Sequence, residues 1–220
     1  MDIEDVNRER LQQAKAYKTM LVFAMGSIVM IFAGLTSAYV ISKNRPDWLK
    51  DFELPQAFLW STIAIVLSSV TFHLAKKAMA KNNRSTTSLM LGITLVLGLI
   101  FVVLQFQGFG QVVDAGYFFT GSQSTITTSF LYVVVLVHIA HLVGGLISLL
   151  IVIYNHYKQK YNSDQMLGIE LSAMFWHFLD FLWLYLFLFF TFESNSADNS
   201  SFKLSLGLLL LLFVSSKSLL

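Results

Sequence analysis

The sequence has 220 residues, 55% of them hydrophobic and only 13% charged, and its formal net charge at neutral pH is +2. Soluble domains carry about 25% charged residues, so this composition excludes an ordinary soluble domain, and the small net charge gives no basic face for nucleic acid. The chain has no cysteine, which excludes disulfides, thiolate metal sites and thiol nucleophiles.

The first 18 residues are polar and mixed in charge, and they lack the apolar core that a signal peptide carries after its short basic start. Four runs without Asp, Glu, Lys or Arg follow, each longer than the roughly 20 residues that a helix needs to cross a bilayer. Together with a last apolar segment, they predict an all-α, polytopic transmembrane bundle of five long helices, at about 19–42, 55–76, 86–106, 129–154 and 168–192.

The segments that connect these helices indicate an orientation. Lys and Arg number four before the first helix, three in the first loop, four in the second, none in the third and two in the fourth. Cytoplasmic loops carry an excess of Lys and Arg. A cytoplasmic N-terminus is therefore favoured, because it places ten of these residues inside and three outside.

The chain after the fifth helix is harder to interpret. Residues 193–201 are a polar loop, and 202–220 are apolar with about thirteen uncharged residues between two lysines. A short sixth span, an interfacial helix and a disordered end are all open, and we favour a helix that packs at the membrane. The chain thus divides into a cytoplasmic segment at 1–18, a five-helix domain at 19–192 and a loop with its tail at 193–220.

Ionisable residues stand inside two of the predicted helices. Glu170, His177 and Asp180 are seven and three residues apart, so they fall within about 80° of one another on the fifth helix. His138 and His141 are three apart and share a face of the fourth helix. An Asp at the centre of a lone membrane helix costs about 2.5–3.5 kcal/mol, and such residues usually face the bundle interior and pair. We therefore expect Asp180 to hydrogen-bond to one of these imidazoles.

Three interpretations of these polar residues are open. In the first, they hold helices together through buried hydrogen bonds. In the second, they carry protons, since His titrates near pH 6.5. In the third, they ligate a metal or haem. Trp176 and Trp183, seven residues apart, predict packing, whereas His156 is assigned to the fourth loop and His73 to the inner end of the second helix. The sequence has no phosphate-binding loop, nucleophile elbow or zinc-protease motif.

The segment ELSAMFWHFLDFLWLYLFLF at 170–189 resembles the last-helix signature of subunit III of haem–copper oxidases. The matching residues are Glu170, Trp176, His177, Phe178, Asp180 and Trp183. A second segment, FLYVVVLVHIAHLVGG at 130–145, resembles the family's paired histidines followed by a glycine, here His138, His141 and Gly145. Weaker matches are Leu104 with Gln105 and the stretch 68–71. The resemblance covers about 18–192, and five spans fit the short bacterial form of the family.

The resemblance implies an accessory subunit of a proton-pumping respiratory oxidase in a bacterial inner membrane. The family's subunit III holds no haem and no copper, since oxygen is reduced in the partner subunits, and it has no active site of its own. It packs mainly against subunit I, with subunit II and a small subunit IV as further partners. It also binds phospholipid, supports proton uptake by subunit I and stabilises the complex. The five ionisable residues then have a structural role, and metal ligation becomes the weakest interpretation.

Two positions depart from the family pattern. Many members have a membrane-embedded Glu where this chain has Ile28, and a Glu-Tyr pair where it has Gly108 and Phe109. The electron donor, cytochrome c or a quinol, stays open, and the equivalent subunit of a quinol oxidase is a close alternative. A nitric oxide reductase-associated homologue and an independent membrane transporter are more distant ones.

Overall fold

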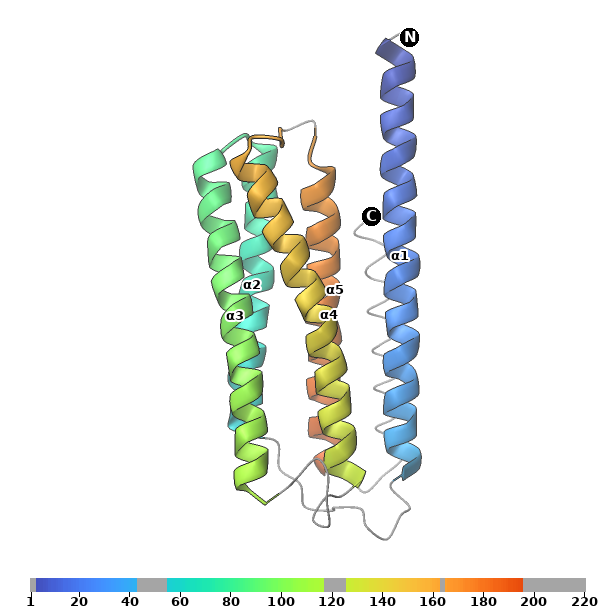
Figure 1. Ribbon diagram of the computed structural model, residues 1–220, viewed down its shortest axis with the longest axis vertical. Helices are drawn as coiled ribbons and strands as arrows, with labels where there is room; N and C mark the ends of the chain where they lie inside the picture. The colour runs from blue at the N-terminus through green and yellow to red at the C-terminus, as the bar shows by residue number, and fades with distance from the viewer. Residues whose placement is uncertain (1–2, 43–54, 117–125, 163–164, 196–220) are drawn as a thin grey trace.

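The computed structural model describes residues 3–42, 55–116, 126–162 and 165–195 (Figure 1). These ranges hold five helices, each long and apolar enough to cross a membrane, which confirms the predicted all-α class and the five spans for the described part of the chain. The helices are α1 (Ile3–Ile41), α2 (Gln56–Ala80), α3 (Arg84–Asp114), α4 (Ile126–Tyr157) and α5 (Leu167–Asn195).

The helices are longer than the apolar runs that predicted them. α1 begins at Ile3 rather than near residue 19, because the polar segment before the span is rich in Arg, Glu, Gln, Ala and Lys, which favour helix. α3 continues to Asp114 rather than ending near 106. For α1, the apolar run marks only the part of the helix that lies in hydrocarbon and misses the polar continuation. For α3, the helix continues through Gly108 and Gly110, which disfavour helix. The apolar tail at 202–220 lies outside the described residues.

α2 and α3 form an antiparallel hairpin that packs along its whole length. The turn between them is short because two asparagines shape it. Asn82 has a positive φ of 54°, a conformation that Asn tolerates better than most residues. The side chain of Asn83 accepts a hydrogen bond from the backbone N–H of Thr86 at 3.3 Å and caps the start of α3.

α4 and α5 complete a four-helix bundle, in which α5 contacts both α2 and α4 while α4 also contacts α3. α1 packs against α4 and α5, and its N-terminal part extends beyond the end of the bundle (Figure 1). At that end the connection between α4 and α5 is tied to the start of α3, because the guanidinium of Arg84 donates to the carbonyl of Tyr161 at 3.2 Å and to Asn162 at 3.0 Å.

Aromatic side chains fill the core of the bundle. The largest fully buried aromatic side chains come from α1, α2, α3 and α5: Phe32, Phe58, Phe72, Phe101, Trp176 and Phe189. The outer faces also carry large apolar side chains, and Phe23, for example, is 74% exposed. A surface of this kind suits hydrocarbon or an apolar partner rather than water. The core therefore positions the polar residues described next inside a largely apolar structure.

Candidate functional site

Trp176 of α5 lies at the centre of the four-helix bundle and is fully buried. Its indole Nε1 donates a hydrogen bond to Ser68 Oγ of α2 at 3.0 Å. On the other two helices glycines make room for the ring. A Cβ at Gly98 of α3 would lie 2.8 Å from the indole, and one at Gly145 of α4 would lie 3.4 Å from it. All four helices of the bundle therefore meet at this side chain.

Trp183 repeats the arrangement two turns further along α5. Its Nε1 donates to Thr62 Oγ1 of α2 at 2.9 Å, and its ring meets Phe101 of α3 edge to face with centroids 5.1 Å apart. The sequence predicts Trp176 and Trp183 as packing residues, and both rings lie buried in the core. The two hydrogen bonds that attach the indoles to α2 were not predicted.

The acceptors of these bonds belong to a row of hydroxyl side chains on α2. Most of them donate their own proton to a backbone carbonyl one turn earlier, as Thr62 does to Phe58 at 2.7 Å and Ser68 to Ile65 at 2.8 Å. The oxygen is then left to accept a bond from a neighbouring helix. We call this set the hydroxyl row; its members are Ser61, Thr62, Ser68, Ser69 and Thr71.

The hydroxyl row also joins α2 to α3. Gln105 Nε2 donates to Ser61 Oγ at 2.8 Å, and the hydroxyls of Thr71 and Thr94 lie 2.8 Å apart. Only the weaker family matches at Gln105 and at 68–71 pointed to these contacts in the sequence. A stronger signal was available, because hydroxyls at spacings of six and seven in an otherwise apolar span indicate a face that bonds to other helices.

His177 and Asp180 lie at the same α2–α5 interface. His177 Nδ1 is 2.6 Å from Ser69 Oγ, and the ring of His73 is 6.4 Å from that of His177, centroid to centroid. Asp180 is only 3% exposed. Ser69 is the polar group next to its carboxyl, but both carboxyl oxygens lack a hydrogen bond of acceptable geometry. The predicted hydrogen bond from Asp180 to an imidazole is therefore wrong.

The two histidines of α4 share a face, as predicted, and both rings contact Phe32 of α1. His138 is fully buried, and neither ring nitrogen has a hydrogen-bond partner. Its ring lies instead among aromatic rings, with Trp183 at 5.2 Å and Phe101 at 6.1 Å. His141 bonds through Nδ1 to the carbonyl of its own helix one turn earlier, at 2.8 Å.

Glu170 finds its partner on α1, where Lys18 Nζ lies 2.9 Å from its carboxylate and both side chains are partly exposed. The five ionisable residues predicted as one cluster therefore lie in three separate places. Glu170 pairs with α1, His177 and Asp180 face α2, and the two histidines of α4 lie beside Phe32. Phe178, the remaining residue of the predicted packing signature, is buried in the core. Within the described part of the chain, no three His, Cys, Asp or Glu side chains are arranged to hold a metal ion.

Three other positions change what the sequence suggested. His156 was assigned to a loop, but α4 continues past it to Tyr157, and its buried Nε2 lies 2.9 Å from Ser88 Oγ of α3. Ile28, which departs from the Glu expected from the family pattern, is buried in the apolar core. A Cβ at Gly108 would lie 3.0 Å from the ring of Phe58, so α3 has little room there for a Glu side chain.

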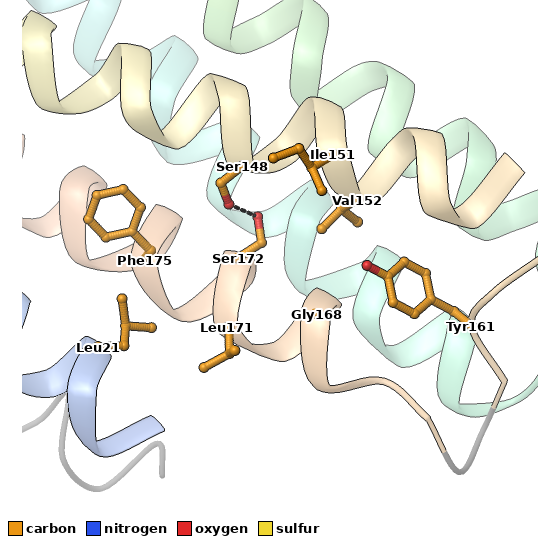
Figure 2. A pocket seen from close by; sticks show the side chains of 9 residues that line it. All are labelled: Leu21, Ser148, Ile151, Val152, Tyr161, Gly168, Leu171, Ser172 and Phe175. Atoms are coloured by element: carbon orange, nitrogen blue, oxygen red, sulfur yellow. Dashed lines mark hydrogen bonds between the residues drawn. The ribbon is translucent and has the colours of Figure 1, made fainter. Parts of the chain in front are cut away.

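Two adjacent cavities lie where α1 approaches α4 and α5. The interhelical cavity has a volume of about 290 Å³ and is lined mainly by apolar side chains such as Leu21, Ile151 and Phe175 (Figure 2). In this view the hydrogen bond between Ser148 and Ser172, 2.6 Å long, joins α4 to α5 beside the cavity. The basic cavity, about 470 Å³, is lined by Arg10, Leu11, Gln13, Ala14, Lys160, Tyr161, Gln165, Met166, Leu167 and Gly168.

The helices that form these contacts are also the part of the chain that matches known proteins. Residues 12–195 match the family model described as cytochrome c oxidase subunit III. The chain belongs to this family. The predicted resemblance to subunit III of haem–copper oxidases is thereby confirmed, and the match extends from α1 to the end of α5.

Relatives come from both eukaryotes and bacteria. The chain is 32% identical over 137 residues to cytochrome c oxidase subunit 3 of Spodoptera frugiperda, over 60% of this chain and 84% of that one. It is 28% identical to cytochrome c oxidase subunit 3 of Bacillus sp. strain PS3, over 73% of this chain and 77% of that one. It is 26% identical to cytochrome bo(3) ubiquinol oxidase subunit 3 of Pseudomonas aeruginosa, over 70% and 74%.

Proposed function

We propose that this chain is an accessory subunit of a proton-pumping haem–copper oxidase in aerobic respiration and that it carries no redox centre itself. The observation that carries the proposal is the family match over 12–195, which includes the membrane part of all five helices. The interior of the bundle supports it, because the space between the helices is filled by packed aromatic rings and by hydroxyl contacts. The oxidase chemistry then takes place at haem and copper in partner subunits.

The proposed main partner is subunit I, with subunit II and a small subunit IV as further partners. The exposed apolar faces of the helices are suited both to such partners and to lipid. We place the complex in a bacterial inner membrane with the N-terminus in the cytoplasm, because the Lys and Arg residues of the connecting segments favour that orientation. Cytochrome c is the first candidate for the electron donor, and a quinol is the second, since relatives of both kinds match.

We also propose that a phospholipid occupies the two adjacent cavities. Tyr161 and Gly168 line both of them, so the two lie next to each other at the start of α5. Arg10 and Lys160 line the basic cavity and complement a lipid phosphate, since each Lys or Arg near a membrane surface contributes about 1 kcal/mol of attraction to anionic lipid. The interhelical cavity is lined by apolar side chains and suits an acyl chain. Lipid would then fill the space between α1 and the rest of the bundle.

The assignment to an oxidase is tested by recovering the tagged chain from its native membrane with mild detergent. We expect a large multi-span partner and haem bands in the reduced-minus-oxidised absorption spectrum. A copper-bearing or cytochrome c-bearing chain in the same preparation would favour cytochrome c as the donor. A colourless chain recovered alone, while oxidase activity stays in the membrane, would contradict the proposal and favour a transporter.

The lipid site is tested on the same complex by native mass spectrometry. Arg10→Gln combined with Lys160→Gln should reduce the anionic phospholipid that remains bound to this subunit after delipidation. Lys15→Gln is the matched control, because Lys15 is exposed on α1 and does not line the cavity. Equal lipid retention in the double variant and the control would contradict the site while leaving the oxidase assignment untouched.

A further inference from the structure

Asp180 is the most unusual ionisable residue of the bundle. Its carboxyl group is almost completely buried between α5 and α2, and neither oxygen accepts a hydrogen bond of acceptable geometry. An ionised carboxylate can only accept hydrogen bonds, and it is costly to bury without donors. A neutral carboxyl group avoids that cost, and it also carries a proton that it can donate. The surroundings of Asp180 therefore suit a bound proton better than a free negative charge.

A series of polar side chains leads from Asp180 towards the surface. Ser69 of α2 lies next to the carboxyl, and its Oγ is 2.6 Å from Nδ1 of His177. The ring of His177 in turn faces that of His73, with centroids 6.4 Å apart. His73 is exposed, and it lies on α2 in the last third of the helix, towards the end at which α5 begins. In order from the surface, the groups are His73, His177, Ser69 and Asp180.

The charged groups around this series favour a proton over a metal cation. His73 and Lys76 of α2 are the groups that act electrostatically on His177. Lys76 and a protonated His73 repel a positive charge that stays near His177, which disfavours a bound metal cation. A proton only passes His177 and is held on Asp180 as part of a neutral carboxyl group. The other buried polar groups of the bundle face elsewhere, since Gln105 of α3 bonds to the hydroxyl row and His138 of α4 lies among aromatic rings. The ion pair of α1 with α5 is likewise separate from this series.

We propose that Asp180 is a proton-binding site and that it exchanges its proton with the aqueous phase through Ser69, His177 and His73. The Asp180 carboxyl gives its proton to Ser69 Oγ, and the Ser69 hydroxyl gives its own proton to Nδ1 of His177. His177 then releases the proton from Nε2 towards His73, through one water that bridges the two rings. Ser69 and His177 each gain one proton and lose one, Asp180 loses one and the aqueous phase gains it, and the reverse sequence reloads Asp180, so no further reactant is needed. This inference holds whichever electron donor and partner subunits the chain has.

The test uses the intact complex and infrared difference spectroscopy during exchange from H₂O to D₂O. We expect a band of a neutral carboxyl group that shifts on deuteration and disappears in Asp180→Asn. We expect Ser69→Ala and His177→Phe to slow the deuteration of this band by at least about tenfold, since positioned proton-transfer groups contribute roughly 10²–10⁴ to such rates. His73→Gln, at an exposed position, should slow it as well and is the variant least able to disturb the fold.

Two controls keep the result specific. Ser172→Ala removes a hydroxyl that bonds to Ser148 of α4 rather than to the hydroxyl row of α2, and should leave the exchange rate unchanged. Thermal denaturation of each variant complex confirms that the bundle is intact. The proposal is overturned if no neutral carboxyl band depends on Asp180, if Na⁺ or Ca²⁺ removes the band, or if His73→Gln and Ser69→Ala exchange as fast as the parent complex.

Discussion

The two sides of α5 are attached to the bundle in different ways. Towards α2, the indoles of Trp176 and Trp183 donate hydrogen bonds to Ser68 and Thr62. Towards α4, the contact depends mainly on shape, because Gly145 lets α5 approach and His138 makes no hydrogen bond. The hydrogen bond between Ser148 and Ser172 adds a polar contact on this side. Apolar burial alone gives little drive for helices to associate within lipid. The difference shows that one helix can use directed polar bonds on one face and close packing on another.

The polar side of α5 also fixes the register of two antiparallel helices. Thr62 pairs with Trp183, Ser68 with Trp176, and the next residue, Ser69, with the next residue of α5, His177. From Thr62 to Ser68 the numbers rise along α2, while from Trp183 to Trp176 they fall along α5, as in antiparallel helices. The pair of Ser69 and His177 lies at the level of the second of these pairs and agrees with the same alignment. A shift of α5 along α2 by one turn would break every bond of this set at once. The shape-based side depends more on close packing, and its bond between Ser148 and Ser172 sets the alignment at one level only.

The largest effect is expected from filling the space beside Trp176. Gly98→Ala places a Cβ 2.8 Å from the rigid indole, so Trp176 or α3 must shift. We expect a loss of about 1–3 kcal/mol in the free energy of unfolding, typical of an overpacked core, and a larger loss for Gly98→Val. The measurement is thermal or denaturant unfolding of the purified subunit, followed by tryptophan fluorescence.

Gly92 provides the matched control for this substitution. It lies on the same helix, but a Cβ there would meet nothing within 4 Å. Gly92→Ala should therefore keep or slightly raise the stability, because Ala favours helix over Gly. Equal stability losses at both glycines would show that α3 depends on glycine for another reason than the close approach of the indole.

A smaller effect is expected from removing an acceptor on the polar side. Thr62→Val keeps the shape of the side chain but leaves the indole N–H of Trp183 without its acceptor. Hydrogen bonds between membrane helices contribute about 0.6 kcal/mol on average and up to about 1.7 kcal/mol. We expect a loss within this range, and a double-mutant cycle with Trp183→Phe isolates the bond itself. A coupling energy of zero would show that the hydrogen bond between Trp183 and Thr62 does not stabilise this interface.

The opposite sign is expected at His138, on the shape-based side. Both of its ring nitrogens are buried without partners, which makes a polar group in this place unfavourable. His138→Leu should leave the free energy of unfolding unchanged or raise it by up to about 1 kcal/mol, since no hydrogen bond is lost. The same unfolding measurement decides this. A loss as large as that of Thr62→Val would mean that the imidazole makes a contact that the packed rings do not explain.

The sequence predicted the fold better than it predicted the contacts. Long uncharged runs were enough for five spans, because the bilayer sets the length of an apolar helix. The full length of α1 was missed because its polar start follows helix propensity rather than hydropathy. The end of α3 was missed because Gly108 and Gly110 disfavour helix locally, although the helix continues through them. For the candidate site, the pattern identified which residues are buried, such as Trp176 and Asp180, but it paired Asp180 with the wrong group. Helical spacing gives the faces of each helix, whereas the partner depends on how the helices pack.

The smallest effect is expected at the third contact of α5, the ion pair between Lys18 and Glu170. This pair differs from the α2 interface because both side chains are partly exposed at the end of the bundle, where solvent weakens the attraction. Such pairs contribute about 0–1 kcal/mol, so Glu170→Gln should lower the unfolding free energy by less than Thr62→Val does. Its effect should also shrink as salt is added, whereas the effect at Thr62 should not. A loss of stability at Glu170 that does not depend on salt would mean that the ion pair is shielded from solvent. The pair would then resemble the buried hydrogen bonds between α5 and α2.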